Sequence, residues 1–223
     1  MRANPSVESV ITDRRNGWLI AMAARLWIRP DDLVVDVTYG EGGFWTHCRP
    51  RHLIAHDLYK GDGVDFRSLP EADGSVDVVV FDPAYVPPGG RETSTIKDMH
   101  DRYGMAQTPK TVEENAALIA AGIKEAGRVL RPAKSNVDGI TQAGPGGRLI
   151  AKTMDFIWSG KLQQGRRWVE DAAAEAGLRK VDEFVHVSGT GPQPKVNLDG
   201  TPRRQVHSRR SHSFLEVFQR GTT

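Results

Sequence analysis

Apolar residues follow two patterns along the chain, and segments with one pattern alternate with segments that have the other. Short unbroken runs of branched apolar residues are typical of strands buried on both faces of a parallel sheet, and the clearest of these is 76–81. Apolar residues spaced three or four positions apart predict amphipathic helices instead. The pattern predicts strands at 33–37, 53–56, 76–81, 148–152, 181–187 and 213–218, and helices over 6–28, from 43, behind 111–114 and over 163–176.

Alternation of strands and helices predicts an α/β fold with a doubly wound parallel sheet. Ligands of such sheets bind beyond the carboxyl ends of the strands. The loops that follow the predicted strands are therefore expected to share one edge of the sheet, called the ligand edge below. These loops begin after Val37, His56, Phe81, Lys152 and Val187. The segment 132–147 enters a strand instead, so we expect it at the opposite edge.

Local signals mark two helix ends. Thr111 followed by Glu114 is the capping-box pattern, in which each side chain bonds the backbone of the other residue at a helix start. Gly177 follows the helical spacing of 163–176 and is expected to end that helix, because glycine readily adopts left-handed backbone.

Composition narrows the class of protein. The chain has 223 residues, of which 39% are hydrophobic and 26% charged, with a formal net charge of +2. A single folded domain over 1–223 is expected, and wholesale disorder is excluded. The one cysteine excludes a disulfide framework and a multi-cysteine zinc site. The longest apolar stretch, 18–28, is about half a membrane span and contains Arg25. We therefore expect a cytoplasmic protein with no membrane partner.

A glycine-rich turn, Asp-Val-Thr-Tyr-Gly-Glu-Gly-Gly-Phe over 36–44, follows the first predicted strand. Glycines such as Gly40 and Gly42 let the backbone approach a ligand and turn sharply into a helix. Asp57 ends the next strand about 20 residues later, where a carboxylate commonly binds a ribose diol. A bare strand–turn–helix corner with solvated acids is the alternative for this segment.

The most informative segment is Phe-Asp-Pro-Ala-Tyr-Val-Pro-Pro over 81–88, directly after the most apolar strand. It suits methylation of a planar amine, whose nitrogen is a poor nucleophile because its lone pair is conjugated with the ring. The Asp82 carboxylate and the Pro83 carbonyl can each accept an N–H bond of that amine, and Tyr85 can hold the ring by stacking. A proline-terminated strand with a capping aspartate is the alternative.

With these motifs the chain resembles the class I S-adenosylmethionine-dependent methyltransferases. More narrowly, it resembles the nucleic-acid amino-methyltransferases, which make N6-methyladenine or N4-methylcytosine and carry an Asp/Asn/Ser-Pro-Pro-aromatic tetrapeptide. The resemblance covers about residues 15–220 and rests on the segments 36–43, 57, 65–66 and 82–85. It implies a Rossmann-like methyltransferase fold, a doubly wound and mostly parallel seven-stranded sheet with an antiparallel last strand.

The resemblance also implies roles for individual residues. The methionine part of S-adenosylmethionine would lie against Asp36, Thr38, Gly40 and Gly42, and Asp57 would bind the ribose hydroxyls. The adenine amine of the cofactor would donate to Asp65, with the backbone of Phe66 beside it. The catalytic group would be Asp82, Pro83 and Tyr85. The sequence departs from the family pattern twice, because Thr38 replaces the first glycine of the usual run and Ala84 replaces the second proline of the tetrapeptide.

Basic residues are concentrated in the last third of the chain. From residue 160 onward there are 11 Lys and Arg against 7 Asp and Glu, a local charge of +4, so the first 159 residues carry −2. The loop over 189–210 starts at the ligand edge, where basic residues suit phosphate contacts. The expected nucleic-acid contacts are Lys195, Arg203, Arg204, Arg209 and Arg210, extended by Lys161, Arg166 and Arg167. A solvated basic loop is the alternative.

Two further segments complete the candidate site. The segment 86–110 is the expected lid over the target base. The group His47, Cys48, His52 and His56 is expected to be scattered by its helix-to-strand geometry, and methyl transfer from a sulfonium needs no metal, so no metal site is predicted.

The function predicted from these features is methylation of an exocyclic base amine, with adenine N6 or cytosine N4 in DNA favoured. Methylation of an RNA base, at guanine N2 or adenine N6, is the first alternative. Glutamine side-chain amide methylation and a non-catalytic cofactor-binding subunit are the others. No separate target-recognition domain is expected in 223 residues, so sequence preference would come from loops or from a partner, either a different chain or a second copy.

Overall fold

The structure, a computed structural model, describes residues 10–86, 109–134, 144–188, 199–201, 206–208 and 210–222. Within them the elements are β1 (Ile11–Thr12), α1 (Asn16–Trp27), β2 (Leu33–Asp36), η1 (Gly43–Thr46), β3 (His52–Ala55), β4 (Val78–Phe81), α3 (Val112–Val129), β5 (Arg148–Thr153), β6 (Phe156–Trp158), β7 (Lys161–Gln163), α4 (Gly165–Glu175), β8 (Leu178–Val187) and β9 (His212–Arg220).

Seven of the described strands form one sheet in the order β1-β8-β9-β5-β4-β2-β3, and β6 with β7 forms a separate hairpin. β9 runs antiparallel to both of its neighbours, whereas every other pairing in the large sheet is parallel. The predicted doubly wound, mostly parallel seven-stranded sheet with an antiparallel last strand is therefore confirmed. Because β9 alone is reversed, β2, β4, β5 and β8 all end at the same edge, the ligand edge.

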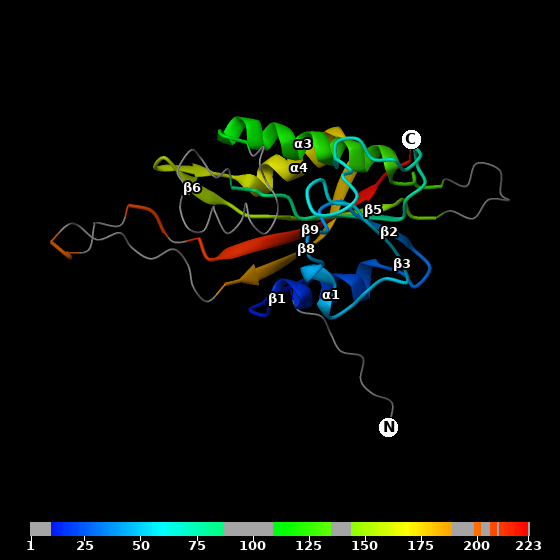
Figure 1. Cartoon of the computed structure of the whole chain (residues 1–223), viewed down its shortest axis with the longest axis horizontal. Coiled ribbons are helices and arrows are strands. Elements are labelled where there is room, and N and C mark those ends of the chain that lie inside the picture. The colour runs from blue at the N-terminus through cyan, green and yellow to red at the C-terminus, as the bar shows by residue number, and fades with distance from the viewer. Residues whose placement is uncertain are drawn as a thin grey trace, which may run out of the picture.

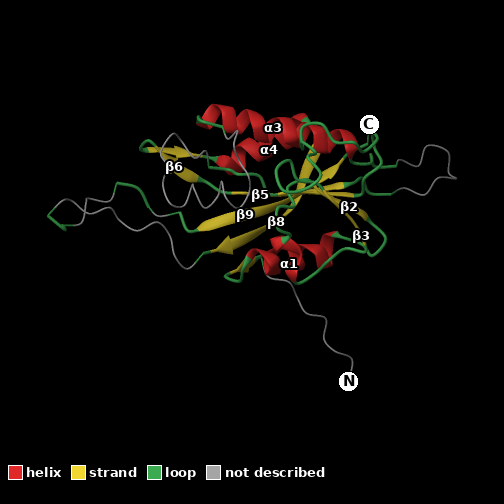
Figure 2. Ribbon diagram, viewed as in Figure 1, coloured by secondary structure: helices red, strands yellow, loops and turns green. Residues whose placement is uncertain are grey.

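Helices cover both faces of this sheet, giving three layers. Figures 1 and 2 show α3 and α4 over one face and α1 under the other. On the first face Ile119 of α3 packs in one core with Leu149 of β5, and on the second Leu19 of α1 shares a core with Ile150. Because side chains alternate along a strand, Lys152 falls on the same face as Ile150, the α1 face.

The predicted helix signals are confirmed. The Glu114 N–H donates to Thr111 Oγ1 over 3.1 Å, and Glu114 Oε2 accepts from the Thr111 N–H over 3.3 Å, which is the reciprocal capping box at the start of α3. Gly177 has a φ of +73°, the left-handed conformation, just beyond the end of α4.

The first helix is shorter than predicted. Residues 11–12 form β1 and pair with β8, with Ile11 opposite Val185, and α1 begins only at Asn16. Arg15 has extended backbone, with ψ of 161°, so the break in apolar spacing at 14–15 is where strand gives way to helix. Of the predicted helix, residues 6–9 lie outside the described part of the chain.

One other prediction was wrong, and one pair of strands was missed. The helix expected from residue 43 is only the single 3₁₀ turn η1. The β6–β7 hairpin was not predicted, because strands of three residues are too short for an apolar period to be recognised.

The described parts of the segment 132–147, which are 132–134 and 144–147, lie at the opposite edge, as predicted, and flank the starts of β4 and β5. The Arg131 N–H donates to the Val76 carbonyl, and the Gly147 N–H donates to the Arg131 carbonyl. In the described part of the chain, no helix is both long enough and apolar enough to cross a membrane.

Candidate active site

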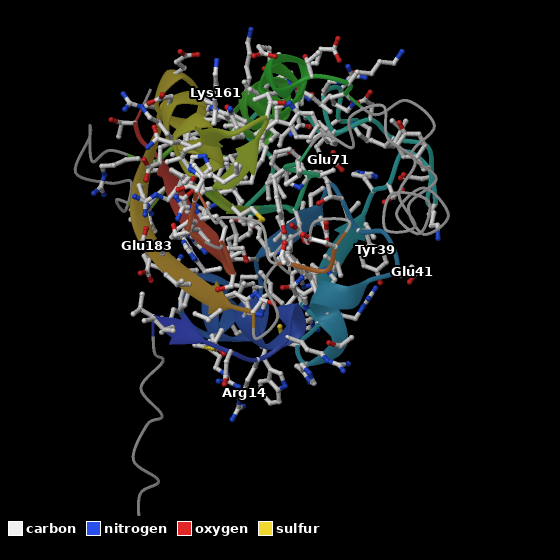
Figure 3. The ribbon with its side chains drawn as sticks, turned by 90° about the vertical axis from the view of Figure 1, so that its left-hand side faces the viewer. Arg14, Tyr39, Glu41, Glu71, Lys161 and Glu183 are labelled. Atoms are coloured by element: carbon white, nitrogen blue, oxygen red, sulfur yellow. The ribbon has the colours of Figure 1, made fainter. Side chains whose placement is uncertain are left out.

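Three neighbouring strands bring the predicted catalytic and cofactor residues together. Asp36 ends β2 and Asp82 directly follows β4, and the two strands pair with Asp36 opposite Val80. β5 pairs with β4 on its other side, with Phe81 opposite Ala151. The structure therefore places Asp36, Asp82 and the end of β5 side by side at the ligand edge, which Figure 3 views nearly end-on, with Tyr39 and Glu41 on one side and Lys161 of the hairpin above.

Asp36 is a buried carboxylate, with 2% of its surface exposed. Its Oδ1 accepts from the Thr38 N–H over 3.0 Å, and its Oδ2 accepts from Trp45 Nε1 over 2.7 Å. Burial raises its pKa to about 7, even though both donors favour the ionised form. Both donors are neutral, so this carboxylate is suited to a cation brought by a ligand.

Thr38 joins the loop after β2 to the loop after β4. Its Oγ1 accepts from the Asp82 N–H over 2.8 Å. The residue that departs from the family glycine therefore holds the backbone of the candidate catalytic aspartate, a role that a glycine has no side chain to perform.

Thr38→Val keeps the shape of the side chain and removes this acceptor. We expect a loss of about 1 kcal/mol in the free energy of unfolding, because a half-buried N–H loses its partner. Urea denaturation measures the change, and Thr46→Val is the matched control, since the Thr46 hydroxyl is exposed and bonds only to the Gly43 carbonyl over 3.3 Å. Equal losses in the two variants would show that the Thr38–Asp82 bond adds nothing to stability.

The glycine-rich loop is tied to the end of β3. The Gly40 N–H donates to Asp57 Oδ2 over 2.9 Å, while Asp57 Oδ1 accepts from the N–H groups of Tyr59 and Lys60 over 2.9 and 2.7 Å. A side chain at Gly42, where φ is +73°, would place its Cβ 2.6 Å from Tyr39 Oη. The loop thus requires glycine at 42, and the Asp57 carboxylate already accepts three backbone bonds from its own chain.

Asp65 and Phe66 are placed differently from one another. Asp65 Oδ2 lies 2.5 Å from Nη2 of Arg67, and this hydrogen bond lowers the pKa of Asp65. Phe66 packs edge-on against Phe81, with ring centroids 5.0 Å apart. Asp65 is therefore bonded to a neighbouring guanidinium, and Phe66 belongs to the apolar floor below β4.

The tetrapeptide after β4 carries a partner that sequence reasoning missed. Pro83 is buried, whereas Asp82 and Tyr85 are half-buried. Nζ of Lys152 lies 3.5 Å from Asp82 Oδ1 and 3.4 Å from Tyr85 Oη. The available signal was a lysine at the end of the apolar run Leu-Ile-Ala in β5, next to the strand that carries Asp82.

The structure describes one of the five predicted nucleic-acid contacts. Lys195, Arg203, Arg204 and Arg209 lie outside the described residues, and Arg210 is described, with its Nη1 donating to Ser208 Oγ over 2.8 Å. The described part of that loop contacts the β6–β7 hairpin, where His207 Nε2 bonds the Gly160 carbonyl over 2.9 Å.

The three residues expected to extend the basic loop differ in their surroundings. Arg166 lies 3.8 Å from Glu170 and 3.7 Å from Glu183, and Arg167 lies 3.6 Å from Asp171. Lys161 is exposed at the start of β7 (Figure 3). Acidic partners thus offset the charge of the two arginines.

The candidate metal group is not gathered at one point. His47 stacks on Trp18 with ring centroids 4.2 Å apart, whereas the buried His56 lies 2.5 Å from Asp62 and 2.8 Å from Glu71. Burial alone would lower the pKa of His56, but the bonds to the two carboxylates raise it. Among the described residues, no three His, Cys, Asp or Glu side chains are arranged to hold a metal ion.

Comparison with known proteins bears on the fold. No protein-family model matches the chain, and no curated protein matches it. A candidate methyltransferase from Bacillus halodurans has a crystal structure that aligns over 91% of this chain and 99% of its own, with a TM-score of 0.53 and 14% identity. The chain has the Rossmann-like methyltransferase fold.

Other proteins whose structures align with this chain include a cyclase and a DNA methyltransferase. The cyclase SpnF aligns over 93% of this chain and 81% of its own, with a TM-score of 0.50 and 11% identity. The cytosine-N4-specific PvuII DNA methyltransferase aligns over 67% of this chain and 44% of its own, with a TM-score of 0.41 and 10% identity. Since a methyltransferase fold also serves a cyclase, the reaction has to be argued from the residues at the ligand edge.

Proposed function

We propose that the chain is an S-adenosylmethionine-dependent methyltransferase that methylates an exocyclic amino group of a nucleic-acid base, adenine N6 or cytosine N4 in DNA. One observation carries this proposal. Asp82, Pro83 and Tyr85 follow β4 at the ligand edge of a methyltransferase fold, and Asp36 lies beside them at the end of β2.

The residues around Asp36 fit S-adenosylmethionine. When bound, this cofactor supplies an electrophilic methyl group on a sulfonium, and it also carries an ammonium group. A buried carboxylate whose pKa is raised to about 7 and whose donors are neutral suits such a cation. Thr38, Gly40 and Gly42 would line the methionine part.

The fit is less direct for the other two cofactor residues. Asp57 would still reach ribose hydroxyls, because a carboxylate accepts about four hydrogen bonds and three are in use. Asp65 would bind the adenine amine only alongside Arg67, to which it is bonded.

Asp82 and Pro83 would prepare the target amine. A base amine has two N–H bonds, and the Asp82 carboxylate would accept one while the Pro83 carbonyl accepts the other. This arrangement localises the nitrogen lone pair for in-line attack, and Tyr85 would hold the ring in place by stacking. After transfer the nitrogen must release a proton, and the Asp82 carboxylate, which would accept one of its N–H bonds, would attract that proton.

Support for a nucleic-acid substrate comes from charge. The last third of the chain carries a local charge of +4, and five of its eleven Lys and Arg residues lie in the loop that connects β8 to β9, which starts at the ligand edge. Backbone phosphates of a polyanion would be held there while a base enters the site. A glutamine side chain would leave these basic residues without a role.

The test is methyl transfer from labelled cofactor to DNA and to RNA, followed by nucleoside mass spectrometry. We expect label in N6-methyladenine or N4-methylcytosine from DNA. Label only in RNA nucleosides would move the assignment to an RNA methyltransferase. Absence of label from every nucleoside, with cofactor binding intact, would refute the proposed activity.

Cofactor affinity is expected to depend on pH through Asp36. A cation binds best to the ionised carboxylate, and the pKa of Asp36 is about 7 in the free protein. Below that pH, binding must first remove a proton from Asp36. Affinity should therefore rise between about pH 6 and pH 8, by about tenfold, and level off above about pH 8.

Calorimetric titration with S-adenosylmethionine across this pH range measures the effect. The Asp36→Asn variant is the control, because an amide does not titrate and its affinity should be flat. An equally steep pH dependence in Asp36→Asn would assign the titration to another group.

A further inference from the structure

Lys152 is a buried cation to which the proposed reaction assigns no role. It lies near the carboxyl end of β5 with 4% of its surface exposed. Its Nζ is 3.5 Å from Asp82 Oδ1, 3.4 Å from Tyr85 Oη and 5.3 Å from the centroid of the Tyr85 ring. A buried ammonium is costly unless it is paired, and the groups that pair it are two of the three proposed catalytic residues.

The surroundings of Lys152 make it the counter-charge of Asp82. Burial alone would lower the pKa of Lys152, but Asp82 and Tyr85 raise it, so the side chain is protonated. His186 on β8 faces it from the other side, and burial together with the charge of Lys152 lowers the pKa of that histidine. Asp36 faces Asp82 from β2 and repels it.

The contacts of Lys152 are longer and fewer than those of Lys180, a lysine in a structural ion-pair cluster on another part of the sheet. Lys180 lies within 2.8 Å of Glu170 and within 2.6 Å of both Glu183 and Glu216, so its ammonium is saturated. The two contacts of Lys152 are at the long limit of hydrogen bonding. Lys152 thus acts on Asp82 mainly as a nearby charge, and the carboxylate keeps its lone pairs for another donor.

Asp36 shows why such a charge matters at this edge. Burial without a cationic partner raises the pKa of that carboxylate to about 7. A neutral base stacked over Asp82 would displace water from it in the same way. A protonated Asp82 would no longer be a full acceptor for the amine, and a fixed ammonium counters that change.

We propose that Lys152 is a positioning residue for methyl transfer, which keeps the Asp82 carboxylate ionised when the base covers it and holds the Tyr85 hydroxyl. This inference rests on the proposed function. It adds the ammonium of Lys152, on β5, to a site whose proposed catalytic residues all follow β4.

The test compares Lys152→Met, which keeps the length and removes the charge, with Lys152→Arg, which keeps the charge. Lys124→Met is the matched control, because Lys124 is an exposed lysine on α3 and has no part in the proposed site. For Lys152→Met we expect kcat to fall about 100-fold with the KM for cofactor unchanged. The acidic limb of the pH profile of kcat should move about one pH unit higher, and Lys152→Arg should restore the limb of the wild type.

A second readout does not need turnover. Carbon-13 NMR of labelled aspartate carboxyls follows the titration of Asp82 in the wild type and in Lys152→Met, with Asp82→Asn to assign the signal. We expect the midpoint to move to higher pH in Lys152→Met. If that variant does not fold, the same titration in Lys152→Gln replaces it.

The outcomes separate the two proposals. Wild-type protein that labels no nucleoside refutes the proposed function, while the NMR titration still tests the Lys152–Asp82 coupling. Wild-type protein that is active, with a Lys152→Met variant whose pH profile and Asp82 midpoint are unchanged, overturns the role of Lys152. A loss of kcat in that variant with no movement of either would reduce Lys152 to a packing residue and likewise overturn it.

Discussion

Replacing Asp82 by alanine is expected to lower the rate of the proposed methyl transfer by about 10²–10³-fold, the usual effect of removing one preorganised hydrogen-bonding group at a reacting centre. The side chain is half-buried beside β4, and its backbone is held by Thr38, so truncation removes the carboxylate without freeing the loop. Cofactor affinity should change little, because the bond from Asp82 to the glycine-rich loop is made by its backbone N–H, which the substitution keeps. Single-turnover transfer of labelled methyl measures the rate.

Two further variants sharpen this prediction. Asp82→Asn keeps one acceptor oxygen in the same place, so it should retain more activity than Asp82→Ala. Asp171→Ala is the matched control, since that aspartate lies on α4, is paired with Arg167, and has a side chain that is 66% exposed. Wild-type rates in Asp82→Ala would exclude the carboxylate from the reaction.

Asp32→Ala is expected to destabilise the fold by about 3–5 kcal/mol, the range seen when one partner of a buried ion pair is removed. Asp32 Oδ2 lies 2.8 Å from Nη1 of Arg148, and these side chains are 6% and 4% exposed. The same Nη1 donates to the Trp27 carbonyl at the end of α1. Without Asp32, a guanidinium stays buried at the start of β5 with one neutral acceptor.

Chemical denaturation measures this loss, and the neighbouring residue is the control. The side chain of Asp31 is 89% exposed and lies 4.0 Å from Arg51, so Asp31→Ala should cost less than about 0.5 kcal/mol. The double variant Asp32→Leu with Arg148→Met should recover most of the stability, because it removes both charges. A small loss of unfolding free energy in Asp32→Ala would show that the attraction between Asp32 and Arg148 does not exceed the cost of removing both charges from water.

Much of the fold could be predicted because long apolar runs have few interpretations. β4 is buried on both faces and flanked by parallel neighbours, so its unbroken branched run admits a central strand and little else. β1 and the β6–β7 hairpin could not be predicted, because two or three residues carry no period. Their pairing is decided by tertiary contacts, such as Ile11 against Val185.

The sequence motifs of the candidate site could be predicted, whereas the side-chain contacts between its residues could not. The order of elements already placed Asp36 and Asp82 at one edge, because carboxyl ends of parallel strands coincide. The pairing of Lys152 with Asp82 depends on the register between β5 and β4, which the sequence does not encode locally. The bond of Asp65 to Arg67 competes with the role that the resemblance implied.

The reversed strand β9 has a consequence for how this protein can change. Val187 at the end of β8 pairs with His212 at the start of β9, and the Ser188 N–H donates to the Ser211 carbonyl over 2.6 Å. The segment between them therefore leaves the sheet and rejoins it at the ligand edge, between two hydrogen-bonded strand ends. Lengthening a segment held in this way costs little entropy, so residues can be inserted there while the pairing of β8 with β9 is kept.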